Sequence, residues 1–169
     1  CSSDLEDRHY NVVVIGGGSG GIACAKALQA SSSGLSVLLA DYVSPSPTRG
    51  STWDIGGTCV NVGCIPKKMF YEAASFGHAF HEMAEYGWNL PKPPQLEWKI
   101  LMKNVQTHIK SLNWGYKSSL SDEHVDVVSA KCSFVGPNQL RLCTTAEEEE
   151  EEGIVGNLSS GGEIITADR

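Results

Sequence analysis

The stretch Tyr10-Asn-Val-Val-Val-Ile-Gly-Gly-Gly-Ser-Gly-Gly21 decides the fold of this chain. Its first six residues form an apolar run rich in β-branched side chains, which is typical of a buried parallel strand. The glycines that follow have the spacing G-x-G-x-x-G, at Gly16, Gly18 and Gly21. Residues 22–30 are rich in alanine and contain no proline, so a helix is predicted directly after the glycines.

A second strand and an acidic residue complete the pattern. Residues 36–40 predict this strand, and Asp41 ends it, twenty residues after Gly21. In this context Gly16 makes the tight turn, Gly18 lets a pyrophosphate approach the backbone, and Gly21 lets the helix pack on the strand. The helix dipole faces the phosphates, and Asp41 can accept a hydrogen bond from a ribose hydroxyl. The sequence therefore predicts a Rossmann-like α/β domain that binds a dinucleotide, rather than a glycine-rich turn that binds nothing.

The other informative stretch is Gly56-Gly-Thr-Cys-Val-Asn-Val-Gly-Cys-Ile-Pro-Lys-Lys68. In a regular helix, residues spaced as Cys59 and Cys64 are separated by about 7.5 Å of rise and a further lateral offset. A disulfide needs Cα atoms closer than about 7 Å, so the pair can close only where the backbone departs from a helix. Gly63 permits unusual dihedral angles, and Pro66 is tolerated only in the first turn of a following helix.

This spacing predicts a distorted loop that opens a helix, with Cys64 near the helix N-terminus. A helix N-terminus and a nearby lysine both stabilise a thiolate, and Lys67 lies one turn after Cys64 on the same face. These features favour a disulfide that is made and broken in a redox reaction. The alternatives are a structural disulfide and two buried free thiols.

Composition bounds the class of protein. The chain has 169 residues, the size of one domain, and is 41% hydrophobic, enough for a core. No run reaches transmembrane length and no basic stripe is present, so neither a membrane nor a nucleic acid is expected as a partner. The six cysteines lack metal-type clustering, so no metal is expected, and Cys24 is expected in the core. A reducing compartment fits, so a cytoplasmic location is expected, with the mitochondrion as the alternative.

The net charge of −7 is concentrated in one place. Glu147–Glu152 supply six negative charges, so the rest of the chain is nearly neutral. Such a run repels itself and stays solvated, which predicts a disordered acidic insertion over residues 144–161, with an acidic docking site as the alternative. Residues 1–9 are expected to form a flexible tail.

Two long helices and a small antiparallel β element are predicted in the rest of the chain. The first helix should begin at Thr58 or Cys64, run to Glu85 and end at Gly87. Apolar residues at helical spacing predict the second helix, from about Leu96 to Leu120. Short strands are expected near residues 125–135, 139–143 and 162–166.

From Tyr10 to its end, apart from the acidic insertion, the chain resembles the flavin disulfide oxidoreductases of the glutathione reductase type. Lipoamide dehydrogenases of this group usually carry serine where Lys67 stands. Two features are similar to the large thioredoxin reductases and the related thioredoxin-glutathione reductases: the proline-containing loop from Asp41 to Trp53, and Asn113-Trp-Gly-Tyr116. Glutathione reductases generally have a shorter loop and lack Asn-Trp-Gly-Tyr. The chain departs from the family at Asp54-Ile55, where glycine and an aliphatic residue are preferred.

The resemblance implies that NADPH reduces FAD and that FAD reduces a Cys59–Cys64 disulfide. Cys64 would be the charge-transfer thiolate nearest the flavin, and Cys59 the exposed interchange thiol. Lys67 would stabilise negative charge near the reactive nitrogen of the flavin. Tyr116 would flank the disulfide-substrate pocket, the alternative being a core aromatic of its helix. The residues that the resemblance assigns to FAD are Gly16, Gly18, Ser19, Gly20, Gly21, Asp41, Tyr42, Gly57, Thr58, Cys59, Cys64, Lys67 and, through its backbone, Ala130.

The resemblance also implies partners. The acceptor would be thioredoxin or a similar protein disulfide, with glutathione disulfide as the alternative, and the enzyme would be a homodimer. The histidine base would come from the partner subunit, so this chain's own histidines are expected to be surface or structural residues. The chain would cover the N-terminal part of the FAD-binding domain, without NADPH and dimerisation domains, and would be inactive in isolation. Two further functions are compatible with the sequence: a nicotinamide-binding dehydrogenase and a non-catalytic FAD-binding fragment.

Overall fold

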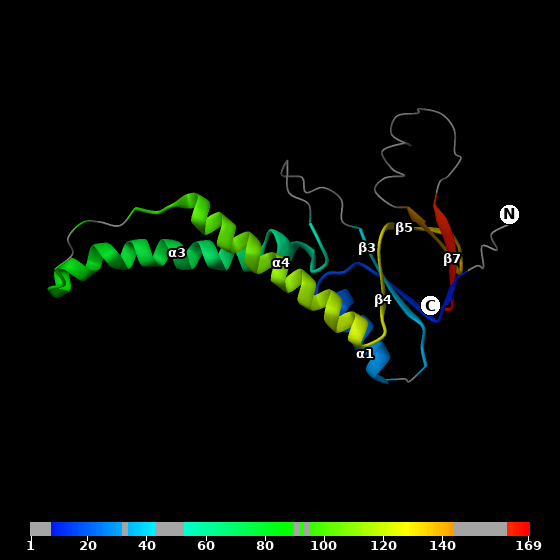
Figure 1. The fold of residues 1–169 in the computed structure, drawn as a ribbon. Helices are drawn as coiled ribbons and strands as arrows, with labels where there is room; N and C mark the ends of the chain where they lie inside the picture. Colours follow the sequence, from blue (N-terminus) through cyan, green and yellow to red (C-terminus); the bar gives the residue numbers. More distant parts are fainter. Residues whose placement is uncertain (1–7, 32–33, 43–52, 90–91, 93–94, 144–161) are drawn as a thin grey trace, which may run out of the picture.

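A computed structural model describes residues 8–31, 34–42, 53–89, 92, 95–143 and 162–169. Two small sheets lie next to each other, and a long hairpin of two helices projects away from them (Figure 1). The acidic insertion expected over residues 144–161 lies outside the described residues, and so do residues 1–7 of the expected tail and most of the loop between Asp41 and Trp53.

The first sheet is parallel and has the strand order β2-β3-β4. Its strands are β2 (Val12–Ile15), β3 (Val37–Asp41) and β4 (Asp126–Ser129). Helix α1 (Ser19–Ser31) connects β2 to β3, and the central strand β3 is almost entirely buried. The predicted Rossmann-like α/β class is therefore confirmed. The helix predicted over residues 22–30 corresponds to α1, and the strand predicted over 36–40 corresponds to β3.

The second sheet has the order β1-β7-β6-β5. Its strands are β1 (His9–Tyr10), β5 (Lys131–Gly136), β6 (Gln139–Cys143) and β7 (Glu163–Ala167). The pairs β5–β6 and β6–β7 are antiparallel, which is the small antiparallel element that the sequence predicts. The pair β1–β7 is parallel.

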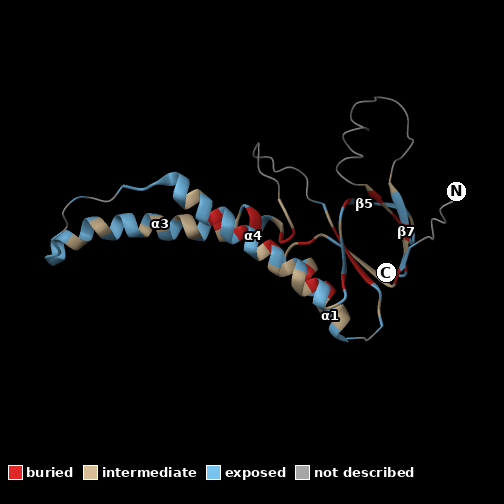
Figure 2. Cartoon of the chain, in the orientation of Figure 1, coloured by how far each residue is buried: buried red, intermediate tan, exposed pale blue. Residues whose placement is uncertain are grey.

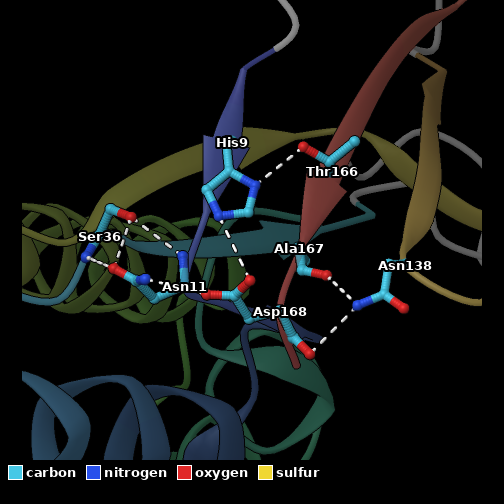
Figure 3. A network of polar contacts seen from close by, with 7 residues as sticks. All are labelled: His9, Asn11, Ser36, Asn138, Thr166, Ala167 and Asp168. Carbon is cyan, nitrogen blue, oxygen red and sulfur yellow. Dashed lines mark hydrogen bonds and ion pairs between the residues drawn. The ribbon is translucent and has the colours of Figure 1, made fainter.

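The run 10–15, predicted as one strand, is divided between the two sheets. Tyr10 pairs with Ala167 in the second sheet, whereas Val12 pairs with Val37 in the first. The division falls at Asn11, whose amide N–H donates to Ser36 Oγ at 3.0 Å while its Oδ1 accepts from the Ser36 N–H at 2.9 Å (Figure 3). The backbone N–H groups of Asn11 and Val12 also donate to the Ser36 carbonyl, so these side-chain bonds add to the backbone bonds at the crossing point. The strand expected over 125–135 is likewise divided, at Ala130.

The expected flexible tail does not extend to residue 9. His9 lies in β1, where its Nδ1 is 3.0 Å from Thr166 Oγ1 and its Nε2 is 3.4 Å from an Asp168 carboxylate oxygen (Figure 3). Asn138 Nδ2 also donates to the Ala167 carbonyl at 2.8 Å. The first and last described segments are thus held side by side.

The hairpin consists of α3 (Cys64–Met83) and α4 (Trp98–Asp122). A 3-10 turn, η1 (Ala84–Tyr86), follows α3 and ends at Gly87, whose φ of 84° lies in the left-handed region that favours glycine. Both helices agree with the prediction, except that the short helix α2 (Gly57–Asn61) precedes α3 separately. The stacked rings of Phe70 and Trp98 join the two arms, with centroids 5.5 Å apart.

Burial is concentrated where α4 reaches the sheets, and most of the hairpin is exposed (Figure 2). Helix α1 packs on the first sheet through Ile22 and Ala25, which lie three residues apart on one face. Cys24, predicted in the core, is exposed because it points from another face of the same helix. No helix in the described part of the chain is long and apolar enough to cross a membrane.

Candidate functional site

The glycine-rich loop has the geometry of a tight turn between strand and helix. Gly16 has a φ of +107°, a region that side chains rarely adopt. A Cβ atom on Gly21 would stand 1.8 Å from the Gly16 carbonyl oxygen. Helix α1 therefore packs directly against the end of β2, and only glycine fits at position 21.

The outer side of this loop is open, as a dinucleotide requires. A Cβ atom on Gly18 would meet only the Cα atom of Gly57, at 4.0 Å, and one on Gly20 would meet nothing within 4 Å. Ser19 is exposed at the first turn of α1, where backbone N–H groups lack helical partners. The loop thus offers bare backbone and a helix N-terminus, which fit a pyrophosphate group.

Asp41 lies at the carboxyl end of β3, next to the glycine loop. Its Oδ1 accepts a hydrogen bond from the Gly17 N–H at 2.8 Å. A side chain on Gly17 would come within 2.6 Å of the other carboxylate oxygen. Asp41 also lines a pocket of about 650 Å³, together with Trp53, Lys117 and the residues of β4. Its position fits the role of ribose acceptor.

Tyr42 and Ala130 lie beside Asp41. Ala130 is buried, and its N–H donates to the Asp41 carbonyl at 3.1 Å, so this N–H is not available to a ligand such as an adenine base. Tyr42 is exposed, with Lys131 Nζ 5.8 Å from its ring centroid. Asp41, Tyr42 and Ala130 thus lie together at the carboxyl ends of β3 and β4.

A second pair of glycines docks α2 onto the glycine-rich loop. Gly56 and Gly57 have φ values of +122° and +67°, and the Gly56 N–H donates to the Gly17 carbonyl at 2.8 Å. A Cβ atom on Gly57 would stand 2.9 Å from the Gly18 Cα atom. The start of α2, with exposed Thr58, is therefore brought against the loop.

The two cysteines lie at a break between helices, as the spacing predicts. Cys59 is in α2 and Cys64 is the first residue of α3. Gly63 has φ −114° and ψ −111°, a combination outside the helix and strand regions, so it supplies the unusual dihedral angles that the sequence predicts. It also has a steric role: a Cβ atom there would stand 2.8 Å from the Thr58 carbonyl oxygen and 3.2 Å from the Cys59 Cα atom. Glycine lets the start of α3 approach α2 closely.

The cysteines are free thiols in this structure, and they interact. A hydrogen bond with the Cys64 side chain raises the pKa of the Cys59 thiol, burial and the charge of Cys64 raise it further, and a hydrogen bond with the Cys64 backbone partly offsets the rise. Cys59, expected to be the exposed thiol of the pair, is half-buried, whereas Cys64 is exposed. Two thiols in contact at the start of a helix can form a disulfide and can be reduced again.

Lys67 and Tyr116 lie differently with respect to the cysteines. Lys67 is exposed one turn into α3, and among the described residues no acidic side chain pairs with it, whereas its neighbour Lys68 pairs with Glu72. Tyr116 is half-buried and packs against the core formed by α1, the first sheet and the end of α4. The structure therefore places Tyr116 in the core position that was the alternative to the pocket.

The other histidines occupy peripheral positions. His78 lies 3.5 Å from Glu82 on the surface of α3. The remaining three are exposed: His81, His108 and His124. Among the described residues no group of acidic, cysteine and histidine side chains has the arrangement of a metal site.

Sequence reasoning missed two buried polar side chains. Asn61 lies between the cysteines and Asn113 lies in α4, and they are 7% and 5% exposed. Asn61 lies within the Cys59–Cys64 stretch, whose functional interpretation rests on the cysteines. Asn113 lies within Asn113–Tyr116, whose interpretation rests only on a family resemblance. The signal that could have identified Asn113 is an amide on the apolar face of a helix, four residues after Ile109.

Comparisons with known proteins agree with this geometry. The family model described as pyridine nucleotide-disulphide oxidoreductase matches residues 10–167. "Thioredoxin reductase SEP1" of Emiliania huxleyi is 42% identical over 159 residues, covering 94% of this chain and 30% of the relative. "Thioredoxin reductase 2, mitochondrial" of Drosophila melanogaster is 48% identical over 126 residues, covering 74% of this chain and 24% of the relative. The chain thus spans less than a third of the length of these relatives.

Proposed function

Because this chain belongs to the pyridine nucleotide-disulphide oxidoreductase family, we propose that it forms the FAD-binding and dithiol-bearing part of an NADPH-dependent disulfide reductase. The observation that carries this proposal is the contact between the Cys59 and Cys64 thiols, where Cys59 lies in the helix α2 that starts against an open glycine loop. A dehydrogenase that only transfers hydride has no use for such a pair.

The described residues fit FAD in two groups. The loop Gly16–Gly21 and the first turn of α1, including Ser19, would bind the pyrophosphate, and Asp41 would bind a ribose hydroxyl. Tyr42 and the Ala130 carbonyl would contact the adenosine part, and Gly57 and Thr58 would contact the flavin part. When bound, FAD would accept a hydride from NADPH and supply two electrons to the Cys59–Cys64 disulfide.

The two sulfurs of the dithiol have different roles in the reduction of the substrate. After the S–S bond is broken, the N-terminus of α3 and the exposed Lys67 stabilise a thiolate on Cys64. The raised pKa of Cys59 keeps its proton at neutral pH until a base removes it. The Cys59 thiolate then attacks one sulfur of the substrate disulfide, which forms a mixed disulfide and releases the other substrate sulfur as a thiolate. Cys64 displaces the substrate thiol from Cys59, which restores the Cys59–Cys64 bond.

We propose thioredoxin, or a protein disulfide like it, as the acceptor. Both relatives described above are named thioredoxin reductases, and the motif Asn113–Tyr116 and the long loop before Trp53 support the same branch. The active protein would be a homodimer.

The test uses the protein produced with the sequence that flanks this chain in its gene. We expect it to be yellow, to bind FAD without a covalent bond, and to reduce thioredoxin with NADPH. The Cys59→Ser variant is expected to keep the long-wavelength absorption of a Cys64 thiolate beside the flavin, and Cys64→Ser to lose it. Identical spectra from the two variants would refute the division of roles, and turnover of glutathione disulfide without thioredoxin would refute the acceptor.

A further inference from the structure

A network of buried amides surrounds the base of α2. The Asn61 side chain donates from Nδ2 to the carbonyl of Asp54 at 2.6 Å and to that of Gly57 at 2.9 Å. Its Oδ1 accepts from the Asp54 N–H at 3.3 Å. One side chain therefore holds both ends of the turn that leads into α2.

Asn113 attaches this turn to α4. Its Nδ2 donates to the Ile55 carbonyl at 2.6 Å and to Asn61 Oδ1 at 3.1 Å. One turn further along α4, Lys117 Nζ lies 2.6 Å from the Asp54 carboxylate. The turn is therefore fixed to α4 by an inner amide bond and an outer ion pair.

The network requires amides rather than any polar groups. Every acceptor of Asn113 Nδ2 is a carbonyl oxygen of the backbone or of an amide, and every acceptor of Asn61 Nδ2 is a backbone carbonyl. An aspartate at either position would place a carboxylate oxygen against carbonyl oxygens in a buried site, where repulsion is poorly screened. An alanine would leave buried carbonyl groups without their donors.

The position of this network determines what it can control. Asn61 lies two residues after Cys59 and three before Cys64. Helix α3, which begins with Cys64, packs along α4 through Phe70 and Trp98. Both cysteine-bearing helices are therefore positioned by contacts with α4. Helix α3 is positioned by packing, and α2 by the amide pair.

We propose that Asn61 and Asn113 are positioning residues that hold Cys59 against Cys64 and thereby favour the disulfide over the dithiol. This inference rests on the proposed redox role of the cysteine pair. Among the described residues, neither amide forms a hydrogen bond with a sulfur atom. Each acts indirectly, by fixing the orientation of α2 relative to α4. Without the pair, the thiols stay separated for more of the time and the S–S bond closes less readily.

The experiment measures the redox equilibrium of the pair in the protein with its flanking gene sequence. The protein is equilibrated with glutathione buffers, in which one glutathione disulfide takes two electrons and two protons from the dithiol and leaves two glutathione thiols and the Cys59–Cys64 disulfide. Acid quenching, alkylation and peptide mass spectrometry then count linked and free cysteines. For Asn113→Ala we expect the oxidation constant to fall about tenfold, which corresponds to a reduction potential about 30 mV higher.

Matched variants separate positioning from general instability. Asn104 is exposed on the same helix, so Asn104→Ala is expected to leave the oxidation constant unchanged. Asn61 and Asn113 share a hydrogen bond. The fold decrease of the oxidation constant in the double alanine variant is therefore expected to be smaller than the product of the fold decreases in the two single variants. In Asn113→Asp the oxidation constant is expected to fall at least as far as in Asn113→Ala. If circular dichroism shows that the aspartate variant has unfolded, the positioning role is judged from Asn113→Ala.

The outcomes distinguish this inference from the proposed function. A normal oxidation constant in a folded Asn113→Ala variant overturns the positioning role, as does an equal loss in Asn104→Ala. If the unsubstituted protein forms no Cys59–Cys64 disulfide at any buffer ratio, the proposed function fails, and the positioning role fails with it.

Discussion

Gly21→Ala is expected to destabilise the protein by more than about 3 kcal/mol, the upper end of the cost of overpacking. The added Cβ atom would stand 1.8 Å from the Gly16 carbonyl oxygen. The clash is with backbone, so no side-chain rotation relieves it, and α1 must move away from β2. The loss is measured as a fall in the urea midpoint of unfolding at unchanged slope.

The control for this substitution is its neighbour in the same helix. Gly20→Ala adds the same methyl group where nothing lies within 4 Å, so helix propensity is expected to make it neutral or slightly stabilising. Equal midpoints for the two variants would show that α1 does not pack on the loop as described.

Gly63→Ala is expected to disable the cysteine pair. Its Cβ atom would stand 2.8 Å from the Thr58 carbonyl oxygen, so α3 must shift away from α2 and Cys64 from Cys59. The oxidation constant of the pair is expected to fall about a hundredfold, or about 60 mV in reduction potential. Since the Cys64 hydrogen bond raises the pKa of Cys59, its loss should lower that pKa. More of Cys59 is then thiolate at pH 8, and its alkylation by iodoacetamide should become faster.

Two internal comparisons support the interpretation of that variant. Gly77→Ala lies on the same helix with nothing within 4 Å, and it is expected to leave both readouts unchanged. Cys24 is exposed on α1, far from the substitution in sequence, so its alkylation rate should stay constant. A Gly63→Ala protein with a normal disulfide equilibrium would contradict the steric role of Gly63.

Local patterns predicted most of the fold, because local chemistry determines it. The spacing of Gly16, Gly18 and Gly21, the apolar periodicity of α4, and Gly87 as a helix end all act within a few residues of where they stand. The break between Cys59 and Cys64 was predictable for the same reason, since a disulfide cannot span a regular helix at that spacing.

What the sequence could not reveal depends on distant partners. The division of a strand at Asn11 involves Ser36, which precedes β3 and bonds to Asn11, and Cys24 is exposed because the sheet selects another face of α1. Asn61 and Asn113 meet although they are 52 positions apart, so no local pattern announces their contact. Gly63 stands at the break as predicted, but its steric role is revealed only by the fold, because its neighbour in space is the Thr58 carbonyl.

The proposed electron path is tested by following the Cys59–Cys64 peptide through one reduction. The protein with its flanking gene sequence is alkylated, digested and analysed by mass spectrometry, before and after one equivalent of NADPH is added without oxygen. We predict that both cysteines are linked to each other and unlabelled before NADPH, and that both carry the label afterwards. Label on both cysteines in the oxidised protein, or a disulfide that survives NADPH while the flavin is bleached, would contradict the claim that this pair receives the electrons.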